Sequence, residues 1–324
     1  MDHTVLQSLS KFEQYVTESY EGRLFFELIQ NARDAAFAGG IYSDIKIIVT
    51  PEKVLFANTG KPFDEKGILA MTRLGLSSKR DHELIGSKGI GFKSIQEFSK
   101  TPKIITEFGT LYFNQEKLRE KLDVRFPDIF DSSSVPLFYY PHYDGKKCEQ
   151  VEEFKDLRFD TIIEFSLDRN KSWNKIVNLY KNITDEELIL LGSIDSISFE
   201  SPYFKKERFF KSSADGYVQC QSTTSNKMYK IFTPETAVEI PDLIYDEFDA
   251  AEKKTYEKER KIDIKLVFEC TAQGAVLPKS HTKSKLYLFY PLETYSGFSY
   301  IIHSNFSCNP ERTTIRDTRL NQFI

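Results

Sequence analysis

Cysteine is scarce in this sequence of 324 residues. The four cysteines are widely separated, they form no C-x-x-C pair, and none has a close histidine partner of the kind that a structural zinc needs. We therefore interpret Cys148, Cys220, Cys270 and Cys308 as buried thiols and predict no zinc site.

Long apolar runs and an excess of one charge are also missing. No run approaches the roughly 20 apolar residues that cross a bilayer, and the first residues lack a basic segment followed by an apolar signal core. We expect a cytoplasmic protein without a membrane partner. The 44 basic and 48 acidic residues leave a net charge of −4, so nucleic acid is not indicated as a partner.

Apolar and aromatic residues are abundant enough for a sizeable core. Hydrophobic residues make up 40% of the chain and include 27 Phe and 17 Tyr. The length favours two domains over one, and the pattern changes near residue 185. We predict one domain over residues 1–185 and a second α/β domain over residues 186–324.

Hydrophobic spacing predicts the main elements. Helices are expected in the first twenty residues, over Gly22–Ala38 with a stop at Gly39-Gly40, over Asp64–Leu74 and over Phe92–Ser99. Strands are expected at Ile45–Thr50, Lys53–Ala57, Lys103–Phe108, Thr110–Phe113 and Thr161–Leu167. In the second half, strands are expected at Leu188–Leu191, Ser196–Phe199, Ile264–Phe268, Leu286–Tyr290 and Phe298–Ile302, around a helical run over Asp242–Lys261.

A polar face is predicted on the second helix. Glu27, Asn31 and Asp34 stand at i, i+4 and i+7, which places them on one side of a helix. Two carboxylates and an amide in this arrangement can orient a water molecule and hold a hard cation through oxygen. Many amphipathic helices carry such a face, so the pattern alone also fits a purely structural role.

A glycine-rich stretch opens into the helix predicted at Phe92. It runs from Gly75 to Lys79 and from Ile85 to Ser94, and Lys79, Lys88 and Lys93 supply cations nearby. Backbone amides at such a turn can cradle phosphates. Phe92 between Gly91 and Lys93 breaks the Walker A pattern, and the glycine order differs from the dinucleotide fingerprint.

A third element, Asn58-Thr59-Gly60-Lys61-Pro62-Phe63, follows a predicted strand. Alone it indicates only a turn. In order, spacing and chemistry, the series ExxxNAxDA, N-x-G-x-x-F, and G-x-S-x-K with G-x-x-G-x-G-F resembles the GHKL superfamily, which includes gyrase B, the ninety-kilodalton heat-shock chaperone, histidine kinases and MutL. The stretch Ile85–Ile95, with Phe289-Tyr290-Pro291, Phe306 and Arg312, looks closest to the sacsin-like branch.

The resemblance implies an α+β Bergerat fold, with helices on a mixed, mostly antiparallel sheet and ATP held under a mobile lid between residues 75 and 91. It implies that Glu27 polarises the attacking water and that Asn31 coordinates Mg²⁺. A transducer-like second domain would contribute Arg312 to the terminal phosphate. The implied nucleotide contacts are Asn31, Asp34, Asn58, Gly60, Lys79, Gly86, Ser87, Lys88, Gly89, Ile90, Gly91, Phe92 and Thr161.

One position departs from the family pattern, because Asn58 stands where the family has an Asp that reads adenine. An Asn can accept a hydrogen bond from an exocyclic amine or turn a donor toward the base, so base preference stays open.

Two functions fit this series. The first is a slow, Mg²⁺-dependent ATPase whose lid closure drives a conformational change, as the N-terminal module of a chaperone-like or defence-type protein. The alternative is an ATP-sensing switch without significant turnover. An ATP-dependent homodimer and a protein client or effector are the candidate partners. A histidine-kinase-like activity ranks last, because none of the five histidines stands in a suitable helical element.

Overall fold

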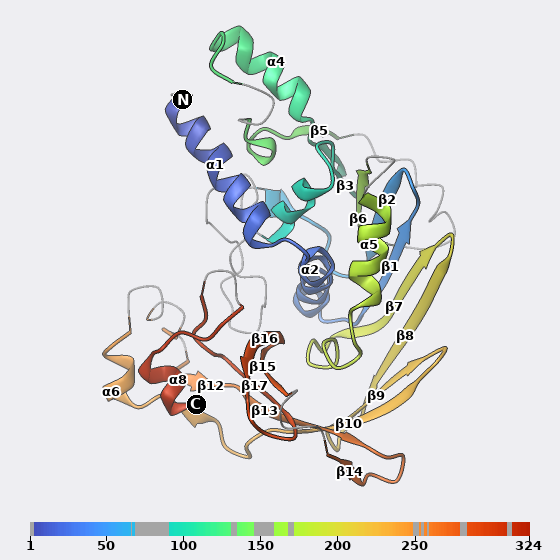
Figure 1. Cartoon of the computed structure of the whole chain (residues 1–324), viewed down its shortest axis with the longest axis vertical. Helices are drawn as coiled ribbons and strands as arrows, with labels where there is room; N and C mark the ends of the chain where they lie inside the picture. Colours follow the sequence, from blue (N-terminus) through green and yellow to red (C-terminus); the bar gives the residue numbers. More distant parts are fainter. Residues whose placement is uncertain are drawn as a thin grey trace. The chain divides into compact units, whose positions relative to one another are not determined.

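The computed structural model describes residues 3–65, 67–68, 91–130, 135–145, 159–167, 172–248, 253, 256–257, 259–278, 284–309 and 313–324 (Figure 1). The chain divides into two compact units. The first combines Met1–Ile183 with Ser193–Glu207, and the second combines Thr184–Gly192 with Arg208–Ile324.

The first unit contains a sheet whose strands follow the order β7-β1-β2-β6-β3-β4-β5. Neighbouring strands are antiparallel, except that β7 runs parallel to β1. The described elements are α1 (His3–Ser19), α2 (Leu24–Gly39), β1 (Ser43–Val49), β2 (Lys53–Asn58), η1 (Gly91–Glu97), β3 (Lys103–Thr106), β4 (Gly109–Tyr112), α4 (Gln115–Arg125), η2 (Leu137–Tyr139), β5 (His142–Asp144), β6 (Thr161–Ser166), α5 (Ser172–Lys181) and β7 (Ile194–Ser201).

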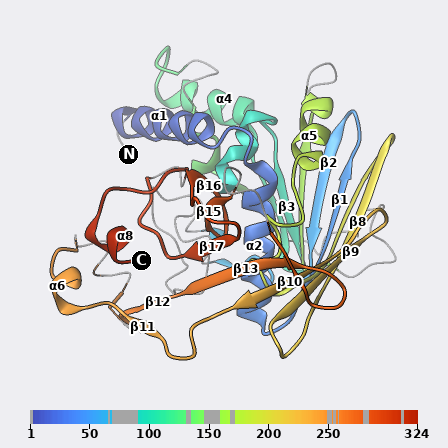
Figure 2. The ribbon, with the colours of Figure 1, turned by 60° about the horizontal axis from the view of Figure 1, so that its bottom comes forward.

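Helices α2 and α5 cover one face of this sheet (Figure 2). The ring of Phe199 on β7 stacks on Tyr180 of α5 at 4.1 Å and meets Phe25 of α2 edge-on at 5.9 Å. Residues directly opposite on paired strands share a face, so Ile47 and Phe56 lie in the same apolar row as Phe199. Burial of this row fixes α2 against the strands.

Helix α2 ends where the sequence predicts. Gly40 takes the left-handed conformation, with φ of 66°, and its N–H donates to the carbonyls of Ala36 and Phe37. This satisfies carbonyls that the last turn leaves without helical partners. The predicted class, helices on a mixed and mostly antiparallel sheet, is confirmed.

The second unit is built largely from antiparallel strands, in the order β16-β15-β17-β13-β10-β9-β8, with β14 paired to β13. Its described elements are β8 (Phe204–Ser212), which begins in the first unit, β9 (Tyr217–Ser222), β10 (Asn226–Phe232), β11 (Val238–Glu239), α6 (Asp242–Tyr245), β12 (Lys261–Ile262), β13 (Ile264–Cys270), β14 (Val276–Leu277), β15 (Lys285–Leu288), β16 (Tyr290–Tyr295), β17 (Ile301–Ser304) and α8 (Arg319–Phe323).

One prediction for this unit is wrong. Leu188–Leu191 forms turns instead of a strand, because the N–H groups of Leu188 and Ile189 donate to the Asp185 carbonyl. Ile189 and Leu190 are nevertheless buried in the core with Tyr229 and Val267. In the run Asp242–Lys261, the structure describes a helix over Asp242–Tyr245 and a helical position at Lys253, and Lys261 begins β12. Residues 249–252, 254–255 and 258 of this run lie outside the described residues.

A buried ion pair joins β8 to the segment before the turns. Arg208 is fully buried, and its Nε lies 2.8 Å from Oδ1 of Asp185. The other carboxylate oxygen of Asp185 accepts a hydrogen bond from Ser225 at 3.3 Å. A buried guanidinium requires such a partner, because its desolvation would otherwise be uncompensated.

We predict that Arg208→Ala lowers the free energy of unfolding by about 3 kcal/mol, because it leaves a buried carboxylate without its cation. The matched control is Arg319→Ala, whose exposed partner Glu247 lies 3.0 Å away. That substitution should cost about 0.5 kcal/mol. Urea denaturation followed by circular dichroism measures both, and equal losses would contradict the assignment.

Candidate functional site

A row of polar side chains interrupts the helix-covered face of the first unit's sheet. Asn58 lies opposite Thr161, and Thr161 lies opposite Thr106, so the three side chains share one face across β2, β6 and β3. Asn58 is two residues beyond Phe56 and therefore points to the same side as that apolar row. Asn58 and Thr161 are buried, with 4% and 7% exposure.

Hydrogen bonds hold the turn that follows Asn58. The Thr59 N–H donates to the Asp44 carbonyl at 3.1 Å, and the Thr59 hydroxyl accepts from the Asp44 N–H at 2.9 Å. The Gly60 N–H donates to the Asp160 carboxylate at 2.9 Å. The turn is thus tied both to the start of β1 and to the residue that precedes β6.

Gly60 brings this turn into contact with α2. Its φ is +140°, and an added Cβ would lie 2.8 Å from the Ala36 nitrogen and 2.9 Å from the Ala35 carbonyl carbon. The next residue, Lys61, donates its N–H to the Ala35 carbonyl at 2.9 Å. Only glycine allows the two backbones to approach this closely.

The contacted part of α2 is adjacent to its predicted polar face. Glu27 and Asp34 are buried, with 7% and 2% exposure, and Asn31 is half-buried. Nη1 of Arg33 lies 3.3 Å from Oδ1 of Asp34, and the Arg33 guanidinium lies over the ring of Phe37 at 4.9 Å. Two buried carboxylates on one helix face are unusual, because burial penalises the charged form.

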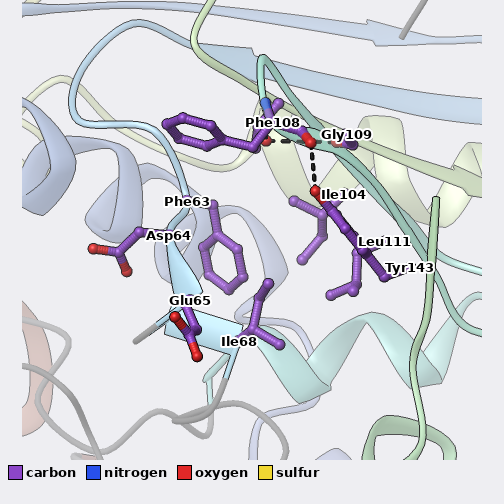
Figure 3. Close-up of a pocket in the computed structure, with 10 residues that line it drawn as sticks. Phe63, Asp64, Glu65, Ile68, Ile104, Phe108, Gly109, Leu111 and Tyr143 are labelled. Atoms are coloured by element: carbon purple, nitrogen blue, oxygen red, sulfur yellow. Dashed lines mark hydrogen bonds between the residues drawn. The ribbon is translucent and has the colours of Figure 1, made fainter. Parts of the chain in front are cut away.

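Thr161 positions the segment that leaves the turn. Its hydroxyl accepts a hydrogen bond from the Phe63 N–H at 3.3 Å. Phe63 lines a cavity of about 470 Å³, which Thr106 from the polar row also lines. Figure 3 shows Phe63 and Ile68 on one side of this space and Ile104 and Leu111 on the other. The remaining lining residues are Asp64, Glu65, Phe108, Gly109 and Tyr143.

Part of the predicted site lies outside the described residues. This holds for Lys79, Gly86, Ser87, Lys88, Gly89, Ile90 and Arg312, and for most of the helix predicted over Asp64–Leu74. Gly91 begins η1, a 3₁₀ helix that ends at Glu97, where the sequence predicts a helix over Phe92–Ser99. The Phe92 ring meets Phe138 edge-on at 5.6 Å.

Lys93 contacts α1. Its ammonium is buried, lies 3.7 Å from Oε1 of Glu13 and is 5.7 Å from the centre of the Phe12 ring. The expectation that Lys93 supplies a cation beside the glycine-rich stretch therefore needs correction, because its amino group is buried against Glu13 of α1. Glu13 Oε1 also accepts from the Phe138 N–H at 3.1 Å.

Burial dominates the titration of this pair. It raises the pKa of the Glu13 carboxyl to about 7, against the opposing effect of the Lys93 charge. Burial likewise lowers the pKa of the Lys93 ammonium, and Glu13 opposes that shift. The pKa of Lys100 is also lowered by burial, with Glu13 acting in the opposite direction.

Glu13 and Asp160 take part in these contacts but were not predicted from the sequence. Glu13 stands among Leu6, Leu9 and Val16 at helical spacing, and a charged residue within that apolar stripe is a signal that could have been recognised. Asp160 directly precedes the predicted strand, but only the folded chain brings it to Gly60.

Comparison with known proteins does not define a family for this chain. No protein family and no curated protein matches the sequence. Among solved structures, the chain is similar to the topoisomerase IV ATP-binding domain of Francisella tularensis, with a TM-score of 0.37 and 14% identity, over 93% of this chain and 82% of that chain. A likeness at this level carries no functional conclusion. Within the described residues, no helix is long and apolar enough to cross a membrane.

We predict that Gly60→Ala destabilises the protein by about 2 kcal/mol or more, because the added methyl group meets the backbone of α2. Gly40→Ala is the control, since Gly40 also has positive φ but an added Cβ there meets nothing within 4 Å. Its cost should be about 1 kcal/mol. Thermal and urea denaturation measure the stability of both variants. Equal destabilisation by the two substitutions would contradict the prediction.

We also predict that the Glu13 carboxyl makes stability fall as pH rises from about 4.5 to about 7. In this window the folded state retains a proton that the unfolded state has released, so its contribution declines by up to about 1.4 kcal/mol per pH unit. Glu13→Gln should remove that slope in urea titrations. Glu18→Gln, at an exposed position of α1, should keep it; parallel slopes in all three proteins would refute the prediction.

Proposed function

We propose that the first unit binds ATP with Mg²⁺ and slowly hydrolyses it to ADP and phosphate. One observation carries the proposal: the polar face of α2, the Asn58–Gly60 turn and Thr161 come from three separate segments and are joined by the Gly60 contact and the pairing of β2 with β6. Such a convergence of polar groups beside a largely apolar cavity is typical of a ligand site.

The adenine base is assigned to the side of the sheet that carries Asn58. The Asn58 Nδ2 donates to the Thr59 carbonyl at 3.2 Å, so this amide group has an internal acceptor. Its Oδ1 is then the atom offered to a ligand, and an oxygen acceptor suits the exocyclic amine of adenine. This supports ATP in preference to a nucleotide whose base carries a carbonyl at the same position.

Glu27 is assigned as the general base that polarises the attacking water. A carboxylate next to an apolar helix surface can accept the proton that the water loses as it attacks the terminal phosphorus. Asp34, whose carboxylate lies beside Arg33, would help to shape the region that holds the nucleotide base and the lid. Hydrolysis of ATP needs such positioning more than covalent chemistry.

Mg²⁺ would be held by the amide oxygen of Asn31. The residues present fit this ion, because Mg²⁺ takes one or two protein oxygens together with substrate phosphates and retained waters. A half-buried Asn31 one turn from Glu27 satisfies that requirement. The bound ion would supply charge neutralisation for the phosphates.

The glycine-rich stretch is assigned to the phosphates, through Gly86, Ser87, Lys88, Gly89, Ile90 and Gly91, with Lys79 and Phe92 at its ends. Arg312 of the second unit would reach the terminal phosphate when a lid over residues 75–91 closes. We assign the chain to the N-terminal ATPase module of a chaperone-like or defence-type protein of the sacsin-like branch. We expect this protein to be cytoplasmic, to form a homodimer that depends on ATP, and to act on a protein client or effector.

We predict that wild type releases phosphate from ATP only with Mg²⁺, that Glu27→Gln reduces the rate at least about 100-fold with ATP binding retained, and that Asn31→Ala weakens Mg²⁺-dependent binding. Calorimetry measures binding and a phosphate-release assay measures turnover. Glu120→Gln, exposed on α4, is the matched control and should behave as wild type.

Two outcomes would redirect the proposal. Binding without turnover in wild type would favour the ATP-sensing switch, although Glu27 is a residue that binding alone does not require. Absence of Mg²⁺-dependent binding at millimolar ATP would overturn the nucleotide site itself.

A further inference from the structure

The sheet of the second unit has one buried face and one partly open face. On the buried face, Val218, Cys220, Tyr229 and Val267 have at most 8% exposure and belong to the unit's core. Residues that alternate with these point to the opposite face, which the strands β8, β9, β10, β13 and β17 present side by side (Figure 1).

Aromatic rings cross this open face from strand to strand. Tyr217 on β9 lies opposite Lys230 on β10, which lies opposite Phe268 on β13. The centre of the Phe268 ring lies 4.8 Å from that of Tyr300, the residue directly before β17. These four side chains therefore form one row over neighbouring strands, about 14 Å long at the usual strand spacing.

Two further rings widen the row, and both are half exposed. Phe298, with 50% exposure, stacks on Tyr300 at 5.4 Å and 27°. Phe232, with 48% exposure, meets Phe268 edge-on at 5.5 Å. We call Tyr217, Phe232, Phe268, Phe298 and Tyr300 the aromatic platform. Phe232 and Phe298 thus present exposed ring surface at the edges of the row, as interaction sites do.

Two lysines stand on this face. Lys230 lies within the platform, 4.2 Å from the Tyr217 ring centre and 5.6 Å from that of Phe232, and its ammonium donates to the Asp215 carbonyl. Lys211 stands on the same face, in register with Gln219, and is exposed. Among the residues paired with these on the described strands, none that shares this face is Asp or Glu.

From this arrangement we infer that the open face of the second unit binds single-stranded nucleic acid, with bases stacked on the aromatic platform and phosphates near Lys211 and Lys230. Stacking rings on an antiparallel sheet, combined with lysines, suit a flexible polyanion with flat bases. The net charge of −4 is that of the whole chain, whereas Lys211 and Lys230 stand on the same face as the platform. The rings contact base faces, which DNA and RNA share, so both should bind.

The rim of the platform favours a single strand over a duplex. An added Cβ at Gly274, in the turn between β13 and β14, would lie 3.2 Å from the Tyr217 hydroxyl, so this turn closes one end of the row. Bases paired within a duplex do not offer free faces to such rings, whereas an unpaired strand does.

The test uses the full chain without added nucleotide and fluorescently labelled oligo-dT and oligo-U of about 15 residues, read by fluorescence anisotropy. We expect saturable binding of both that weakens as salt increases, and at least about tenfold weaker binding of a duplex of equal length. No binding at tens of micromolar protein, or equal affinity for the duplex, would overturn the inference.

Variants identify the surface. Phe232→Ala and Phe298→Ala should each weaken binding by roughly 5- to 100-fold, and Phe232→Leu should also weaken it, because it keeps apolar volume but removes the ring face. Tyr203→Ala removes a ring with 86% exposure from the first unit and should change nothing. Equal effects of all four, with circular dichroism unchanged, would place any binding elsewhere.

Discussion

Close packing between the Gly60 backbone and α2 is the constraint on which the candidate site depends. It places the end of β2 against the helix one residue after Asp34, at a separation that no side chain on Gly60 would permit. The register of β2 with β6 then fixes Thr161 beside Asn58, and Thr161 in turn holds Phe63 at the cavity. A local backbone contact thus sets the position of polar groups on three segments.

Buried charges play different parts in the two units. In the second unit, Arg208 and Asp185 form a close pair in which a second partner, Ser225, occupies the remaining carboxylate oxygen. In the first unit, Glu13 and Lys93 are farther apart, and burial pushes both toward their neutral forms. The first arrangement fixes a strand, whereas the second makes the contact between α1 and η1 sensitive to protons near neutrality.

Local patterns predicted local structure, and they failed where tertiary contacts decide. The helix with Glu27, Asn31 and Asp34, its stop at Gly40 and the strands before Asn58 follow from hydrophobic spacing and glycine chemistry. Leu188–Leu191 was misassigned because turns, and not a strand, bring its apolar residues into the core. The spacing of hydrophobic residues along the sequence does not reveal such turns. The aromatic platform also escaped prediction, since its members are brought together only by strand pairing.

The polar row has a consequence for synthesis of the chain. Gly60 and Asp160 are 100 residues apart. Asn58 lies opposite Thr161 only after β6 has been synthesised and paired with β2. Non-local pairing of this kind is slow, because closing the long loop costs entropy before any stabilising contact has formed. A nascent chain that ends before residue 161 therefore cannot assemble the row, and ligand capture there would report that β6 has paired with β2.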